Sequence, residues 1–156
     1  MRKLLYPLLA VLLLGSCGPD YILDRRYEME GAQWTYDNVL SFEAEIPDTL
    51  GVYNLWMEID HGKDFAYQNL YTRITTIFPD QKRLEQQLSF ELADKFGNWQ
   101  GDCRGDRCRV RIPIQESAFF NQAGTYTFML EQYMRTDSIP AVRTIRFQIE
   151  DTGIRR

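Results

Sequence analysis

An alternation of apolar and polar residues with a period of two limits how this chain can fold. It recurs in seven segments, residues 39–46, 53–59, 71–77, 88–92, 110–114, 126–130 and 142–149. Successive side chains of a strand point to opposite faces, so this period predicts strands with one apolar face. Turn-forming residues separate the segments. We therefore expect an all-β domain: an antiparallel β-sandwich of about seven to nine strands, jelly-roll or immunoglobulin-like. Short helical turns are expected at residues 81–84 and 117–121.

The N-terminus has the pattern of a bacterial lipoprotein signal peptide. Arg2 and Lys3 precede an apolar run, and the small residues Gly15 and Ser16 stand directly before Cys17. The run is shorter than the roughly 20 residues of a transmembrane helix. We expect cleavage before Cys17 and acylation, including palmitate, of its thiol and new amine. Such a protein is anchored to a cell membrane without spanning it.

These signals predict three parts of the chain. Residues 1–16 are the signal peptide, residues 17–26 the lipidated cysteine and a tether, and residues 27–152 a single β-sandwich domain. Removing residues 1–16 from the 156 leaves 140, enough for one core. Two of the 18 basic residues go with the signal, so 16 face 22 acidic ones, a net charge of −6. This balance argues against nucleic acid and against broad docking on anionic lipid.

Two further cysteines, Cys103 and Cys108, enclose the turn-forming residues 104–107. An exported protein meets oxidising conditions, in which a disulfide across a short hairpin is stable. A metal site is the alternative, but it needs more ligands than this pair and the chain has a single histidine, His61. We therefore expect a disulfide and no metal.

Residues for catalysis are sparse. His61 lies in a segment that resembles a loop and is expected to be a solvated turn residue. Several carboxylates alternate with apolar residues and are expected to face solvent: Glu43, Glu45, Glu58, Asp60 and Glu91. Glycosidase chemistry needs two carboxylates at a set separation, which no spacing here indicates. We expect no catalytic residue, no cofactor and no enzyme activity; an envelope hydrolase is the second alternative.

Candidate contacts for a partner come from aromatic residues and one arginine. Trp56 is out of phase with the apolar side of its strand, Trp34 is a further open candidate, and Arg135 carries a planar donor fork suited to a partner's carboxylate. Trp99, between two glycines, is assigned to packing. Exposed aromatic residues beside amides would instead favour a carbohydrate- or glycan-binding module, which is the first alternative function.

Three segments carry a resemblance to a known family. They are Tyr67-Gln68-Asn69-Leu70-Tyr71, Gly97-Asn98-Trp99-Gln100-Gly101, and Glu131-Gln132-Tyr133-Met134-Arg135 followed by Asp137 and Ile139. Together with the lipoprotein signal, they resemble the gliding motility lipoprotein GldH family of the Bacteroidetes from about Tyr27 to Ile149. The resemblance implies a non-enzymatic accessory lipoprotein of the cell envelope. Its implied partners are other proteins of the gliding machinery and of the secretion apparatus coupled to it.

The residues that follow Cys17 bear on which side of a membrane the protein faces. Gly18, Pro19 and Asp20 lack the acidic or lysine-led cluster that resembles a surface-export signal in Bacteroidetes. This favours a periplasm-facing protein, anchored to the inner or the outer membrane.

Replacing Cys17 tests the anchor. Cys17→Ala removes the thiol that accepts the acyl chains, so we expect an uncleaved or soluble form in place of the mature lipoprotein. Detergent partitioning and N-terminal mass spectrometry measure this. Unchanged partitioning with a mature N-terminus elsewhere would refute the assignment.

Overall fold

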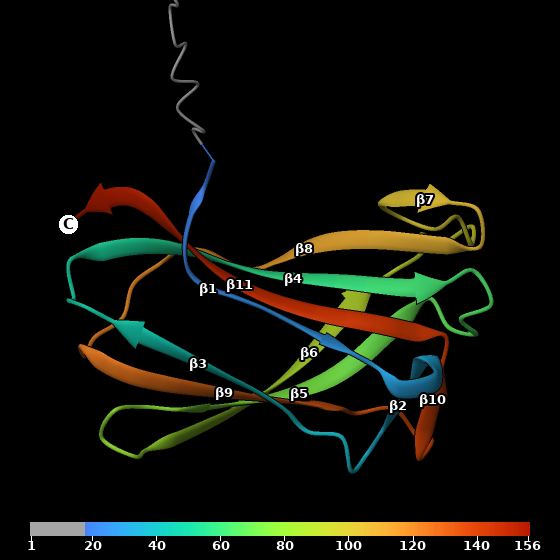
Figure 1. Ribbon diagram of the computed structural model, residues 1–156, viewed down its shortest axis with the longest axis horizontal. Coiled ribbons are helices and arrows are strands. Elements are labelled where there is room, and N and C mark those ends of the chain that lie inside the picture. The colour runs from blue at the N-terminus through green and yellow to red at the C-terminus, as the bar shows by residue number, and fades with distance from the viewer. Residues whose placement is uncertain (1–17) are drawn as a thin grey trace, which may run out of the picture.

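A computed structural model describes residues 18–156, so Cys17 and the signal peptide lie outside the described residues. Two antiparallel sheets lie face to face (Figure 1). The five-stranded sheet has the order β1 (Asp20–Glu28), β11 (Val142–Arg155), β4 (Gly51–Gly62), β8 (Arg107–Ala118) and β7 (Asp102–Arg104). The four-stranded sheet has the order β3 (Leu40–Ile46), β9 (Gly124–Gln132), β5 (Asn69–Ile77) and β6 (Arg83–Glu91). A ladder of β2 (Gln33–Thr35) and β10 (Ser138–Pro140) stands beside the 3₁₀ helix η1 (Glu30–Ala32).

The strand pairing identifies the sandwich as a jelly roll. Its long strands pair as a nested hairpin: β1 with β11, β3 with β9, β4 with β8, and β5 with β6. Successive pairs of this hairpin fall alternately in the two sheets. This wrapping produces the two Greek keys of a jelly roll. The expected all-β sandwich is confirmed, and of the two arrangements left open the jelly roll is the one observed.

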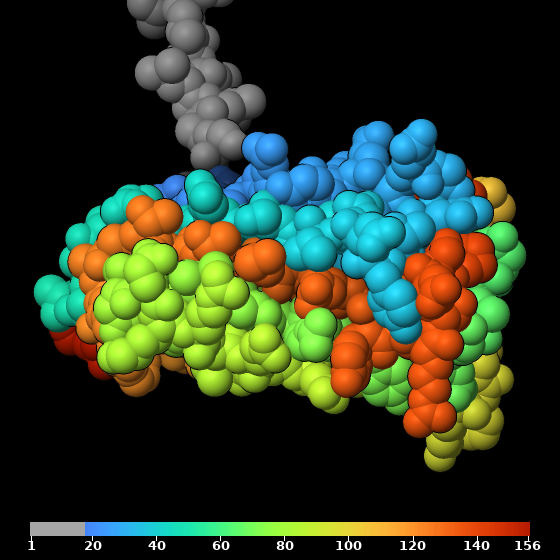
Figure 2. All heavy atoms as spheres, turned by 90° about the horizontal axis from the view of Figure 1, so that it is seen from below, coloured from blue at the N-terminus to red at the C-terminus, as the bar shows by residue number. Residues whose placement is uncertain are grey.

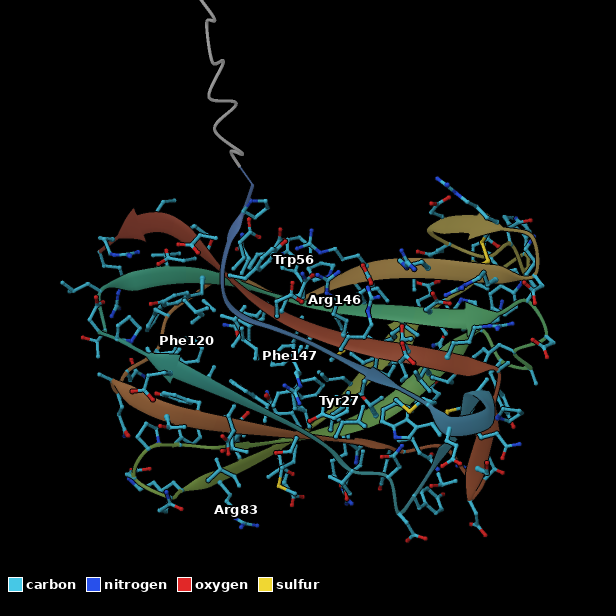
Figure 3. The ribbon with its side chains drawn as sticks, viewed as in Figure 1. Tyr27, Trp56, Arg83, Phe120, Arg146 and Phe147 are labelled. Carbon is cyan, nitrogen blue, oxygen red and sulfur yellow. A yellow bond between two sulfur atoms is a disulfide. The ribbon has the colours of Figure 1, made fainter. Side chains whose placement is uncertain are left out.

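The core lies between the sheets and follows the alternation of the sequence. In β3, for example, every second residue from Leu40 to Ile46 is buried and those between are exposed. Phe42 of β3, Phe128 of β9 and Phe147 of β11 meet edge to face across the layers, with centroids 5.3 Å and 5.1 Å from Phe147. Edge-to-face contacts add to the hydrophobic stabilisation of the buried rings. Figure 3 places Phe147 between the layers.

The boundaries of the domain differ from expectation at both ends. Residues 20–26, assigned to the tether, belong to β1, which pairs with β11 from Asp20 opposite Asp151 to Glu28 opposite Thr144. At the other end β11 continues to Arg155, past residue 152. The alternation is faint in β1 because an edge strand buries little of its surface and charged residues fill it. The three-residue strands β2, β7 and β10 are too short to show a period.

Neither of the expected helical turns forms. Gln81 and Lys82 precede β6, which begins at Arg83, and Ser117 and Ala118 are the last two residues of β8. Gln81 has φ 66° and Ser117 has φ 53°, both in the left-handed region. That conformation is incompatible with a right-handed helical turn.

The expected disulfide is confirmed, and it closes the β7–β8 hairpin. Cys103 and Cys108 are directly opposite in the antiparallel pair, and their sulfur atoms are bonded. The turn between these strands holds Gly105 at φ 60° and Asp106.

Trp34 is a core residue, so its assignment as a partner contact is wrong. It lies in β2 opposite Ile139 of β10, with no exposed surface, and its indole nitrogen donates a hydrogen bond of 2.8 Å to the Asn38 carbonyl. The β2–β10 ladder places this ring at the end of the sandwich, where its apolar atoms are buried and its N–H group has a hydrogen-bond acceptor.

Truncating Trp34 tests this placement. We expect Trp34→Ala to lower the free energy of unfolding by about 3–5 kcal/mol, because it empties a buried aromatic site. Chemical denaturation of the detergent-solubilised protein measures it, with Tyr71→Ala as a control in which the ring is 48% exposed. Equal stability of the two variants would contradict a core role for Trp34.

Candidate interaction surface

Two of the segments singled out in the sequence meet at one end of the four-stranded sheet. One leads into β5 and the other follows β9, and the strands pair up to Thr72 opposite Gln132. Beyond that pair, the Tyr133 amide donates to the Tyr71 carbonyl at 2.8 Å, and the Tyr71 amide lies 3.3 Å from the Met134 sulfur. Tyr67, Tyr71 and Tyr133 are thereby gathered at one place, although more than 60 residues separate Tyr71 from Tyr133.

A buried glutamine fixes the turn after β9. The Gln132 side chain is 2% exposed. Its oxygen accepts from the Met134 amide at 2.9 Å and its nitrogen donates to the Thr136 carbonyl at 2.9 Å. The Tyr36 hydroxyl donates to the Met134 carbonyl from the other side. Buried polar groups that are fully paired rigidify their surroundings. The turn therefore presents Tyr133 and Arg135 outward while Gln132 and Met134 are buried.

The result is a hollowed patch that we call the tyrosine surface: Tyr36, Tyr67, Tyr71, Tyr133 and Arg135. The four tyrosines are between 43% and 48% exposed. Two adjoining hollows of about 460 Å³ and 570 Å³ share Tyr133, Met134 and Arg135 as lining residues. The amide side chain of Gln87 on β6 lines the first hollow. Figure 2 shows the side of the molecule on which the strands of this sheet lie in turn, from cyan β3 to yellow-green β6.

One cation at this surface is neutralised and one is not. Arg73 on β5 donates to Glu131 at 2.8 Å, and its guanidinium lies 5.3 Å from the centre of the Tyr133 ring. The hydrogen bond with Glu131 raises the pKa of Arg73. Arg135 is exposed and forms no hydrogen bond or ion pair with any of residues 18–156. The surface thus offers several aromatic rings and one guanidinium without a partner.

Trp56 lies elsewhere, on the outer face of the five-stranded sheet (Figure 3). It is partly buried: its indole nitrogen donates to Glu150 on β11 at 2.8 Å, and the Arg111 guanidinium of β8 lies 4.3 Å from its ring centre. Trp56 therefore ties three strands together on their outer side. The structure does not bring Trp56 and Arg135 into one site. Both residues are at outward positions, and the sequence does not indicate that these positions lie on different faces of the domain.

The same outer face holds a buried carboxylate, contrary to expectation. Asp60 on β4 is 1% exposed because Arg107 and Arg109 of β8 cover it. The Arg107 Nε atom donates to it at 3.2 Å and the Arg109 Nη2 atom at 3.3 Å. Burial alone would raise the pKa of Asp60, but the hydrogen bonds from the two arginines outweigh it and lower that pKa. Glu43, Glu45 and Glu91 are exposed as expected, and Glu58 is partly buried.

His61 is also buried, so its assignment to a solvated turn is wrong. β4 extends to Gly62 because β8 and β11 pair with it on both sides, placing His61 opposite Cys108 and Val142. Its ring packs against Trp99 at 4.8 Å between centroids, and Nδ1 lies 2.9 Å from the Gly62 carbonyl oxygen. Burial lowers the pKa of His61, which favours the neutral ring. Trp99, partly buried here, has the packing role expected for it.

The part of the chain that the structure describes contains no group of three His, Cys, Asp or Glu residues placed to hold a metal ion. Within residues 18–156 no helix has the length and apolarity needed to cross a membrane.

The fold and its surface define a class: a small jelly-roll domain that carries its hollowed aromatic patch at one end of a sheet. The sequence profile of the GldH lipoprotein family matches residues 21–154, and the chain belongs to that family. It is 25% identical over 146 residues to the gliding motility lipoprotein GldH homolog of Christiangramia forsetii, covering 93% of this chain and 88% of that protein. It is 26% identical over 149 residues to the gliding motility lipoprotein GldH of Flavobacterium johnsoniae, covering 95% and 91%. The predicted family is confirmed.

Among solved structures, the chain is similar to the carbohydrate-binding module TmCBM61 in complex with β-1,4-galactotriose. The identity is 14%, the match covers 86% of this chain and 82% of that one, and the TM-score is 0.27. A likeness this weak supports no conclusion about function.

The Asp60 cluster makes a prediction about pH. We expect Asp60→Asn to destabilise the protein by about 2 kcal/mol at pH 7, less than the roughly 3–5 for breaking a fully buried pair, because the arginines are half exposed. The folded pKa of Asp60 lies below its unfolded value of about 3.9, so its contribution is complete above that value and is lost as the pH falls through the folded pKa.

Denaturation of wild type and variant across pH 2–8 would measure this effect, with the exposed Glu43→Gln as the matched control. The difference between wild type and Asp60→Asn should shrink below about pH 4. A difference that is constant over the whole range would contradict an ionic contribution from Asp60.

Proposed function

We propose that this protein is a lipid-anchored accessory component of the gliding motility machinery, linked to its secretion apparatus, and that it acts by protein–protein contact through the tyrosine surface. The names of the relatives support the link with gliding. The observation that carries the contact is the convergence of four half-exposed tyrosines and the unpaired Arg135 on one hollowed patch. Tyrosine and arginine are enriched at interfaces and dominate their binding energy.

The position of the anchor agrees with this use of the surface. Only Gly18 and Pro19 separate Cys17 from β1. A three-residue step spans at most about 10 Å, so a lipid on Cys17 keeps the domain close to the membrane. β1 belongs to the five-stranded sheet, the upper layer in Figure 1, whereas the tyrosine surface borders the lower, four-stranded layer. The surface therefore faces away from the anchored side, towards partners in the envelope; we propose the periplasm as that space.

The tyrosine surface also supports a second candidate, binding of an envelope glycan. Aromatic faces beside an amide group suit a sugar ring, and Gln87 supplies an amide next to Tyr71 and Tyr133. We rank protein contact first because the unpaired guanidinium of Arg135 suits a carboxylate better than a neutral sugar hydroxyl. A non-enzymatic role is part of the proposal in either case.

Two substitutions test the proposed contact. We expect Tyr133→Ala and Arg135→Glu each to reduce recovery of co-purifying envelope proteins, with a loss of affinity near thirtyfold, equal to about 2 kcal/mol for a hot spot. Affinity purification of the anchored lipoprotein, followed by quantitative mass spectrometry, measures it. Phe96→Ala is the matched control, since Phe96 is 78% exposed but lies outside the tyrosine surface.

The outcome separates the two candidates when thermal melts show all variants folded. If both variants recover every partner as well as the wild type does, the protein-contact proposal is wrong. If the wild type retains an envelope glycan that Tyr133→Ala loses, and protein recovery is unchanged, glycan binding would replace protein contact as the proposed function.

A further inference from the structure

The outer edge of β6 is a long strand edge without a partner. β6 pairs with β5 along one side, in a register that runs without a shift from Asn69 opposite Glu91 to Ile77 opposite Arg83. On its other side, no strand or loop among residues 18–156 forms backbone hydrogen bonds with residues 84–90. β6 contains no proline, and seven of its nine residues are exposed. Such an edge is a ready template for a further strand.

The other sheet edges are protected in the ways that natural proteins use. β1 carries a register shift between Tyr21 and Leu23 and lies alongside β3, so these two edges cover one another. β7 is three residues long, and β8 beyond it has register shifts near Pro113. Short strands, bulges and proline all discourage strand addition. β6 alone among the described strand edges is long, regular and open.

An inward-facing leucine on β6 shows that the core layer is incomplete there. Leu84, Leu88 and Phe90 share the face that meets the core, as their partners Thr76, Thr72 and Leu70 do on β5. Phe90 is 3% exposed, but Leu84 is 47% exposed. Covering such an apolar side chain with a neighbouring strand removes its surface from water, and this burial is favourable in free energy.

When β6 is reversed onto itself, its two outermost pairs of positions are complementary. We infer that β6 pairs antiparallel with β6 of a second copy of this chain, about a two-fold axis at Gln87. In that register Arg83 stands opposite the second copy's Glu91 on the outer face, and Leu84 stands opposite its Phe90 on the core face. Opposite charges and apolar pairs across strands both stabilise a sheet. A closed two-fold interface of this kind is the commonest form of self-association.

The pairing is compatible with two anchors in one membrane. The two-fold axis of an antiparallel strand pair is normal to the sheet, so it keeps both five-stranded sheets on the same side. β1, which follows the anchor, belongs to that sheet in each copy. The two four-stranded sheets become one continuous sheet with both tyrosine surfaces on its free side. Anchoring in a membrane raises the effective concentration of each copy for the other, so even a modest strand interface can form.

A cysteine at the two-fold axis tests the pairing on the full, lipid-anchored chain in its own membrane. In the proposed register, position 87 of one copy stands opposite position 87 of the other, so Gln87→Cys is expected to give a thiol-sensitive band of twice the monomer mass on mild oxidation. Arg83→Cys is the matched control on the same strand and face. Its two sulfurs would lie about eight residues, or roughly 27 Å, apart, and no such band is expected.

Co-expressing Arg83→Cys with Glu91→Cys places cysteines opposite one another and should restore the crosslink. Equal crosslinking of Gln87→Cys and Arg83→Cys would indicate random collision and overturn the proposal. So would a Gln87→Cys protein that stays monomeric, or one that crosslinks only to a different protein.

Charge exchange supplies a second measurement, in the Gln87→Cys background. Arg83→Glu places two pairs of acidic residues opposite each other, and Glu91→Arg places two pairs of arginines, so each should reduce the crosslinked fraction at least threefold. Each chain of a mixed Arg83→Glu and Glu91→Arg pair meets opposite charges at both positions, so co-expression should recover the crosslink. Failure of the mixture to recover while both variants remain folded would exclude this register.

Discussion

The burial of one apolar layer between two sheets is the constraint on which the other features of this domain depend. Phe42, Phe128 and Phe147 meet in that layer from three different strands, two in one sheet and one in the other. Because side chains alternate along each strand, committing every second residue to this layer fixes which residues face outward. A shift of one residue in β9 would bury Glu131 and expose Phe128. The outward positions of Arg73 and Glu131 are therefore consequences of core packing, and so is their ion pair.

The two outer faces use their polar groups differently. On the five-stranded sheet several arginines and carboxylates form ion pairs. Asp60 pairs with Arg107 and Arg109, and Arg146 on β11 pairs with Asp24 on β1. Trp56 is held between Glu150 and Arg111 in the same way. These contacts cross three strand boundaries and stiffen the sheet to which β1, the first strand after the predicted anchor, belongs. At the end of the four-stranded sheet, by contrast, Arg135 has no partner among the described residues, and four tyrosine rings are half exposed.

The sequence alone predicted the all-β sandwich, the disulfide and the family, because each depends on a signal that is local or periodic. It could not predict β1, since an edge strand such as this one buries too little surface to impose an alternation. It misplaced Asp60 and His61 for a related reason: both lie near the end of β4, and their burial comes from Arg107, Arg109 and Trp99, which are distant in sequence. Trp34 was misassigned because its three-residue strand has no period to read. The tyrosine surface was anticipated only through Arg135 and its segment; its assembly depends on the pairing of β5 with β9.

The groups that we propose for contact with other molecules lie at the four-stranded sheet, whereas the strand that follows Cys17 belongs to the five-stranded sheet. Several charges of the five-stranded sheet are paired internally, among them Asp60 and Asp24. The short step from Cys17 to β1 puts that sheet nearest the predicted anchor. The tyrosine rings and Arg135 lie at one end of the other sheet, β6 is its edge strand, and Gln87 on β6 lines one of the tyrosine hollows. An exposed aromatic ring, an unpaired guanidinium and an open strand edge each gain free energy only from contact with another molecule. Their placement at the sheet farther from the predicted anchor is what a protein needs if its membrane attachment and its recognition of partners are to operate independently.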